Sequence, residues 1–345
     1  MPKPPRLLWP DLVRAVAICL VIIIHVCGSV LNTGYAASGR FTWWFSALLS
    51  SFARCGVPLF FMSSGALLLD KIKGDTVGAF FVKRMSRIVV PFLAWSVAYL
   101  ILRAVRGNVQ WSVGSFLTIL QGPVYYHLWF FYAIIGLYIV TPLFKFADKQ
   151  IFRYVALVWI IIGPAMFFLS RVAPISFNNN FRSVFPTYIG YFVMGYLLKD
   201  AILKKGLALI LSAVFLIYGI ATAAAFTFQT IHNGGTQDGF FLDFLNLNVM
   251  AGSIALFCLL RALGEKIHGI TFKKSVQLIS ACSLGIFAVH PMILELLASG
   301  NLGIRLTATY SSVIIGTLLT FSVVLLASTG ITLLISKIPA LNRIV

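Results

Sequence analysis

Long apolar stretches separated by short polar gaps make up nearly the whole chain. Most of them reach the roughly 20 residues that an α-helix needs to cross the hydrocarbon core of a bilayer. The pattern predicts an all-α, polytopic membrane protein with about ten transmembrane helices, forming a single membrane domain over residues 1–345. The ten stretches are 11–31, 41–69, 86–105, 124–144, 151–170, 184–199, 206–229, 244–263, 277–298 and 311–336.

Lysine is restricted to alternate gaps between these stretches. All thirteen lysines lie in the two terminal tails, in every second gap or at its edge, and the other gaps contain arginine but no lysine. Cytoplasmic loops retain positive charge. The alternation therefore predicts an even number of spans with both termini cytoplasmic, and places the loops near 106–123 and 230–243 outside. The first stretch is expected to be a retained helix rather than a cleaved signal peptide, because it is long and carries ionisable residues.

Composition agrees with this class of protein. The mean hydropathy is +0.96, with 60% hydrophobic and 10% charged residues, which leaves no soluble domain of any size outside the spans. The net charge of +18 is spread over short inner loops and forms no single basic surface. It therefore favours contact with anionic membrane lipids and excludes nucleic acid as the expected partner.

Three ionisable residues interrupt the first apolar stretch: Asp11, Arg14 and His25. A charge inside a membrane span requires a partner or a function. Eleven residues are about three turns of an α-helix, so Arg14 and His25 are expected on one face, about 16 Å apart along the axis. Arg14 then lies near the inner surface, and His25 lies well inside the membrane.

This arrangement fits a ligand with an anionic head at the cytoplasmic face and a reactive end within the membrane. Acyl-coenzyme A is such a ligand, with phosphates and a thioester at opposite ends of an extended arm. A neutral imidazole would take the proton from a hydroxyl that attacks the thioester. Structural alternatives stay open: Arg14 reaching headgroups or pairing with Asp11, and His25 forming an interhelical hydrogen bond.

A second basic group stands at the start of the third apolar stretch. Arg84 and Arg87 are three residues apart, on one face of the expected helix, with Lys83 beside them. Guanidinium groups bind phosphate through paired hydrogen bonds, whereas lysine offers a point charge. The group is a candidate site for coenzyme A phosphates; the alternative is a basic anchor at the membrane surface.

Further ionisable residues lie in or beside the spans. His290 is deep in the ninth stretch and precedes Pro291, so it is expected to line a cavity, while His127 is expected near the outer end of the fourth. Arg54 lies in the second stretch and Glu295 toward the outer end of the ninth. These two are candidates for pairing with each other or for contacting substrate.

Together these residues resemble the acyltransferase-3 family of membrane acyltransferases, which includes enzymes that O-acetylate bacterial surface polysaccharides. The resemblance covers nearly the whole chain and rests on six motifs in order. It departs from the family at Ser63 or Ser64, where a larger residue is usual, and this bears on the shape of the pocket. The motifs are Asp11, Arg14 and His25; Gly56–Gly65; Lys83–Ile88; His127–Phe130 with Thr141-Pro142; Tyr188–Phe192 with Gly195; and Ser283–Ile286 with His290-Pro291.

The resemblance implies an O-acyltransferase in the bacterial cytoplasmic membrane. The donor would be a cytoplasmic acyl-coenzyme A, most commonly acetyl-CoA with succinyl as an alternative, and no metal is expected. The acceptor would be a hydroxyl of a cell-surface polysaccharide, an exopolysaccharide or a lipid-linked saccharide. The resemblance makes His25 the catalytic residue and Arg14 its essential companion; His290, His127, Asp11 and Glu295 are further catalytic or cavity candidates.

A second interpretation is a transporter that flips a lipid-linked or polymeric glycan without covalent chemistry. Such a protein would use Arg14 and His25 for anions and protons. It would not need a phosphate-sized basic site at the inner mouth, and the chain shows no inverted repeat of the kind common among transporters. The sequence therefore favours the enzyme.

Overall fold

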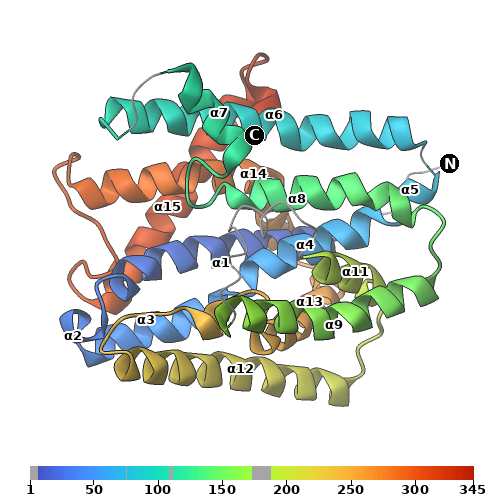
Figure 1. The fold of residues 1–345 in the computed structure, drawn as a ribbon, viewed down its shortest axis with the longest axis horizontal. Coiled ribbons are helices and arrows are strands. Elements are labelled where there is room, and N and C mark those ends of the chain that lie inside the picture. The colour runs from blue at the N-terminus through green and yellow to red at the C-terminus, as the bar shows by residue number, and fades with distance from the viewer. Residues whose placement is uncertain (1–6, 75, 109–111, 173–187) are drawn as a thin grey trace. The chain divides into compact units, whose positions relative to one another are not determined.

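The computed structural model describes residues 7–74, 76–108, 112–172 and 188–345, and throughout these ranges the regular structure is helical with no strand (Figure 1). The elements are α1 (Trp9–Leu31), α2 (Tyr35–Ser38), α3 (Arg40–Ala53), α4 (Gly56–Leu68), α5 (Lys71–Gly74), α6 (Val77–Val105), α7 (Val113–Gln121), α8 (Trp129–Val140), η1 (Thr141–Phe144), α9 (Lys149–Val172), α11 (Ile189–Leu198), α12 (Lys205–His232), η2 (Phe240–Leu242), α13 (Leu247–Lys266), α14 (Ile270–Ser299), α15 (Val313–Ser336) and η3 (Asn342–Ile344).

Eight helical segments in the described part of the chain are long and apolar enough to cross a membrane. Two further predicted stretches form shorter apolar helices, Trp129–Phe144 and Ile189–Leu198. The prediction of an all-α polytopic membrane protein is confirmed, while the number of ten spans and the orientation of the termini stay predictions. The gap between the predicted stretches 151–170 and 184–199 and the start of the latter lie largely outside the described residues, as does the lysine at position 3.

The chain folds into two compact units, which are described separately; the predicted single domain over 1–345 stays a prediction. Unit 1 consists of Met1–Ser63 and Leu198–Leu334. Its centre is α1, which packs against α3, α13 and α14, while α12 covers α3 and α13. Trp43 is fully buried in this core, stacks on Phe226 with ring centroids 5.7 Å apart, and donates from Nε1 to Thr227 Oγ1 at 3.1 Å.

Unit 2 consists of Ser64–Leu197 and Ile335–Val345. Here α6 packs against α7, α8 and η3, and Trp95 donates from Nε1 to the carbonyl of Ile344 at 2.9 Å. Gly65 of α4 lies directly against α11, because a Cβ added there would sit 1.7 Å from the carbonyl oxygen of Phe192. Close backbone approach at glycine is the usual way in which membrane helices gain contact. Two of the sequence motifs therefore meet at this position.

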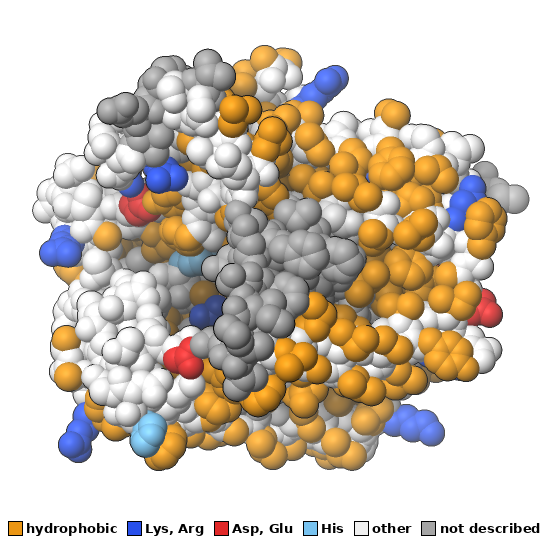
Figure 2. Space-filling model, viewed as in Figure 1, with side chains coloured by type: hydrophobic (Ala, Val, Ile, Leu, Met, Phe, Trp, Pro, Cys, Tyr) orange, Lys and Arg blue, Asp and Glu red, His pale blue; other side chains and the backbone are white. Residues whose placement is uncertain are grey.

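Helix α12 shows why the chain needs an apolar surrounding. It begins at Lys205 and ends at His232, and many of its large apolar side chains between these ends are exposed. Figure 2 shows many hydrophobic side chains along the lower edge of the view, where Figure 1 draws α12. A surface of this kind is stable against lipid tails, not against water. The exposed residues are Leu207, Leu209, Ile210, Leu216, Ile217, Ile220, Phe228 and Ile231.

The predicted orientation can be tested at two exposed positions, Ser112 before α7 and Thr236 after α12. With both loops outside, cysteines at these positions in a background without native cysteines should react with a membrane-impermeant maleimide in intact cells. Lys274→Cys, on the predicted inner side, serves as the control that should react only after permeabilisation. Protection of both outer positions would overturn the orientation.

Candidate active site

Helix α1 carries the three ionisable residues that the sequence singled out. It runs without interruption from Trp9 to Leu31, so the predicted separation of about three turns between Arg14 and His25 holds. Both side chains are half-buried, and Asp11 is buried in the first turn. The single helix α1 therefore carries Asp11 and Arg14 near its start and His25 toward its other end.

The inner part of α1 is held by two serines from other helices. Ser280 of α14 donates from Oγ to Asp11 Oδ1 at 2.8 Å, and Arg14 Nε donates to Ser63 Oγ of α4 at 3.1 Å. Ser63 is fully buried, and the departure from the usual family pattern is expected at Ser63 or at Ser64 beside it. A small hydroxyl side chain here leaves room for the guanidinium and accepts a hydrogen bond from it.

The structure brings His25 and His290 together. Their ring centroids are 5.1 Å apart, with the ring planes tilted by 32°. His290 is fully buried in α14, and its Nδ1 lies 2.8 Å from the carbonyl oxygen of Phe287 and 3.1 Å from that of Ile286. A carbonyl only accepts, so Nδ1 carries the proton and Nε2 of the neutral ring carries the lone pair.

Pro291 explains why a backbone carbonyl is available to His290. In a regular α-helix the carbonyl of Phe287 would accept from the backbone N–H of residue 291, but proline has no N–H. The imidazole of His290 occupies this vacancy with its own Nδ1–H. The His-Pro pair thus satisfies the backbone and fixes the tautomer of the histidine in one turn of helix.

A break in the second membrane segment supplies the other cationic group. Helix α3 ends at Ala53 and α4 begins at Gly56, with Arg54 between them. The carbonyl of Ser51 at the end of α3 accepts a hydrogen bond of 2.5 Å from the hydroxyl of Tyr218. Irregular backbone at membrane depth occurs where it lines a cavity or is buried in protein. Arg54 stands at such a place.

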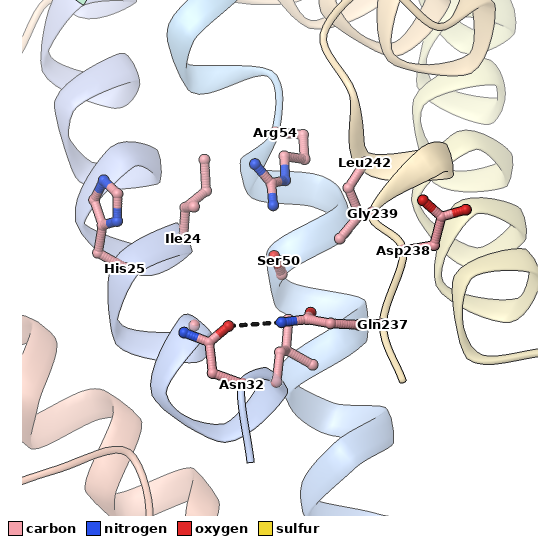
Figure 3. Close-up of a pocket in the computed structure, with 11 residues that line it drawn as sticks. Ile24, His25, Asn32, Ser50, Arg54, Gln237, Asp238, Gly239 and Leu242 are labelled. Atoms are coloured by element: carbon pink, nitrogen blue, oxygen red, sulfur yellow. Dashed lines mark hydrogen bonds between the residues drawn. The ribbon is translucent and has the colours of Figure 1, made fainter. Parts of the chain in front are cut away.

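A cavity of about 390 Å³ opens beside this break, and His25 and Arg54 both line it (Figure 3). At its rim, Gln237 donates from Nε2 to Asn32 Oδ1 at 2.6 Å, joining the end of α1 to the loop after α12. In the predicted orientation this rim is on the outer side. The remaining lining residues are Ile24, Gly28, Leu31, Ser50, Asp238, Gly239 and Leu242.

Two other predicted site residues, His127 and Glu295, are not among the lining residues of this cavity. His127 belongs to unit 2, where it is buried beside Tyr99, Tyr125 and Tyr126 at ring distances of 4.9, 5.8 and 5.6 Å. Glu295 is half-buried in α14. Its predicted pairing with Arg54 stays a prediction; the aromatic contact that the structure shows for Arg54 is with Phe244, 5.6 Å from the guanidinium carbon to the ring centroid.

The basic group of unit 2 lies in the first half of α6. Thr76 caps this helix by accepting from the backbone N–H of Ala79 at 3.2 Å. Lys83 and Arg87 are exposed, and Arg84 is half-buried with an Nε that has no hydrogen-bond partner among the described residues. Two guanidinium groups one turn apart are thus available to a ligand.

Sequence reasoning missed several residues of the site. Neither Ser63 nor Ser280 was predicted to form a hydrogen bond in the site, because serines are frequent in membrane helices. Asn32, Gln237 and Asp238 lie in or beside turns, where their residue types are expected for local reasons. The only signal was the expected departure from the family pattern at Ser63 or Ser64.

Comparison with known proteins identifies the family of the chain. The chain matches the acyltransferase-3 family, described as an acyltransferase domain, over residues 7–337. It therefore belongs to this family, and the predicted resemblance is confirmed. The protein is an acyltransferase with several membrane-crossing helices. No curated protein and no solved structure matches the chain.

The hydrogen bond between Ser280 and Asp11 should contribute to stability. Ser280→Ala leaves a buried carboxylate oxygen without this donor and should lower the free energy of unfolding by about 1–3 kcal/mol. Ser275→Ala is the matched control, because Ser275 is exposed on the same helix and donates only to the carbonyl of Thr271 at 3.2 Å. Thermal unfolding of the purified variants in detergent measures the difference; equal stability would show that the contact contributes nothing.

Proposed function

We propose that this acyltransferase transfers an acyl group, most simply acetyl, from cytoplasmic acyl-coenzyme A to a hydroxyl of a cell-surface or lipid-linked glycan. The bacterial cytoplasmic membrane is the proposed location. The observation that carries the proposal is the position of His25. It stands beside a second histidine at a cavity that opens to the outer side in the predicted orientation, on a helix whose inner part carries Arg14.

The proposed reaction uses His25 as general base. The acceptor oxygen forms a bond to the acyl carbon while the carbon–sulfur bond of the thioester breaks. The hydroxyl proton passes to the imidazole of His25 and from there to the departing thiolate, which leaves as coenzyme A. A two-step route, in which His25 first carries the acyl group, balances in the same way.

His290 has a positioning role in this proposal. Its Nδ1–H is held by backbone carbonyls, so its ring stays fixed beside that of His25. A fixed neighbour restricts the orientation of the catalytic imidazole, and orientation contributes strongly to proton transfer. His290 is also the alternative base if His25 only packs, since both rings lie within the same unit.

The two ends of the donor are assigned to different residues. The phosphates of coenzyme A are assigned to Arg84 and Arg87, with Lys83 adding to the positive field. Arg14 is assigned to the arm or the diphosphate. Paired guanidinium groups and the unpartnered Nε of Arg84 support this assignment. A transporter would have no use for such a donor site. Transfer of radiolabelled acetyl from acetyl-CoA to a glycan by the purified protein therefore distinguishes an acyltransferase from a transporter.

The role of His25 is tested by substitution. His25→Ala should lower acyl transfer by about 10²–10⁴-fold or more, the usual contribution of a general base, while donor binding stays largely intact. His290→Ala should reduce transfer less, because it removes orientation rather than the base. Both variants are compared after purification and a check of folding by thermal unfolding. Substantial turnover without His25 would refute the assignment, and loss of donor binding would give His25 a binding role.

The donor site is tested by calorimetry. Arg84→Ala and Arg87→Ala should each weaken acetyl-CoA binding by about 1–3 kcal/mol, the range for a charged hydrogen bond. Lys274→Ala is the control, an exposed lysine on the predicted inner side and outside the proposed site. Unchanged affinity in the folded double variant would make the group a membrane-surface anchor.

A further inference from the structure

Two polar atoms at the outer cavity have no partner within the described residues. They are Nε of Arg54 and Oγ of Ser50, and both atoms are buried without a hydrogen bond. Buried polar atoms in proteins are nearly always bonded to protein, water or ligand. A donor that remains charged at all physiological pH values, such as a guanidinium, has the greatest need for a partner.

The aromatic and acidic groups around Arg54 have the following contacts. Phe244 offers the face of its ring to the guanidinium. Tyr218 and Asp243 are in electrostatic range, and Asp243 Oδ1 also accepts from the backbone N–H of Leu245 at 2.9 Å. Asp238, which lines the cavity, accepts from Gln229 Nε2 at 2.8 Å. In Figure 3 the guanidinium of Arg54 is directed into the space between α1 and the loop that carries Asp238.

We infer that this cavity is the acceptor site and that it selects an acidic saccharide, whose carboxylate or phosphate pairs with Arg54. Guanidinium groups bind both anions through paired hydrogen bonds. Ser50 Oγ then supplies a further hydrogen bond to the same anion or to a neighbouring hydroxyl. The inference rests on the proposed function and deepens it, because it names the class of acceptor.

The rest of the cavity suits a sugar. Its volume of about 390 Å³ is within the usual range for small-molecule sites. Asn32 and Gln237 offer amide groups at the rim, which hydrogen-bond to hydroxyls. With the anion held at Arg54, a hydroxyl of the same saccharide is placed toward His25, which lines the same cavity. The ion pair with Arg54 thus determines which hydroxyl of the saccharide lies near His25.

Gly28 provides a direct way to test occupancy. It lines the cavity, and a Cβ at this position would meet no atom within 4 Å, so a cysteine fits. In a background with the five native cysteines replaced by alanine, Gly28→Cys should react with a membrane-impermeant maleimide from outside. Asn301→Cys, exposed in another predicted outer loop and absent from the cavity lining, is the control.

The probes are D-glucuronate, α-D-glucose 1-phosphate and D-glucose. Glucuronate or glucose 1-phosphate should slow labelling of Gly28→Cys but not of Asn301→Cys, and glucose should have little effect. The first two probes separate carboxylate from phosphate as the preferred anion. Equal protection by glucose, or no protection by any of the three, would overturn the inference.

Substitutions of Arg54 and Asp238 change the local charge in opposite directions and test the inference further. Arg54→Gln should weaken protection by the acidic sugar about tenfold or more, the loss expected for a charged hydrogen bond. Asp238→Asn should strengthen it, because a nearby negative charge is removed. Arg54→Lys keeps the charge and should retain part of the affinity, which covers the case in which Arg54→Gln does not fold. Protection that is unchanged in both Arg54 variants would overturn the inference.

This assay needs neither donor nor turnover. Protection without acyl transfer would uphold the acidic-saccharide site and refute the proposed enzyme function. Transfer to a neutral sugar without protection by either acid would uphold the enzyme and refute the site. The two failures are therefore distinguishable.

Discussion

Inside a membrane the chain must supply hydrogen-bond partners for its own backbone, because lipid tails offer none. The described helices meet this constraint at two irregular points. Tyr218 donates to the carbonyl of Ser51 where α3 gives way to α4, and His290 donates to the carbonyl of Phe287 where Pro291 removes the usual donor. Both points lie next to residues of the candidate site. The first presents Arg54 to the cavity, and the second places His290 beside His25.

The constraint also explains why the fold was largely predictable. Segments long enough to cross a bilayer can only be helical in a chain of this composition, so counting apolar residues was sufficient to find them. The relation between Arg14 and His25 followed from the geometry of one helix and needed no tertiary information. The shorter helix at Ile189–Leu198 was predicted to begin several residues earlier, in a part of the chain outside the described residues.

The candidate site was predictable only in part, because its contacts join distant segments. Nothing in the sequence pairs His25 with His290, which are separated by most of the chain. Hydrogen bonds from Ser280 and to Ser63 depend on how helices face each other. The cavity depends on a loop after α12 whose residues have ordinary turn composition.

The His-Pro step in α14 has a consequence for how the enzyme works over time. Many histidines take their tautomer from a partner on another element, and a shift between the two elements changes the position of the proton. In α14 the acceptors lie three and four residues away on the same helix. The hydrogen-bond partners of Nδ1 therefore move together with His290. The tautomer of the ring is preserved through any rearrangement that substrate entry or product release requires.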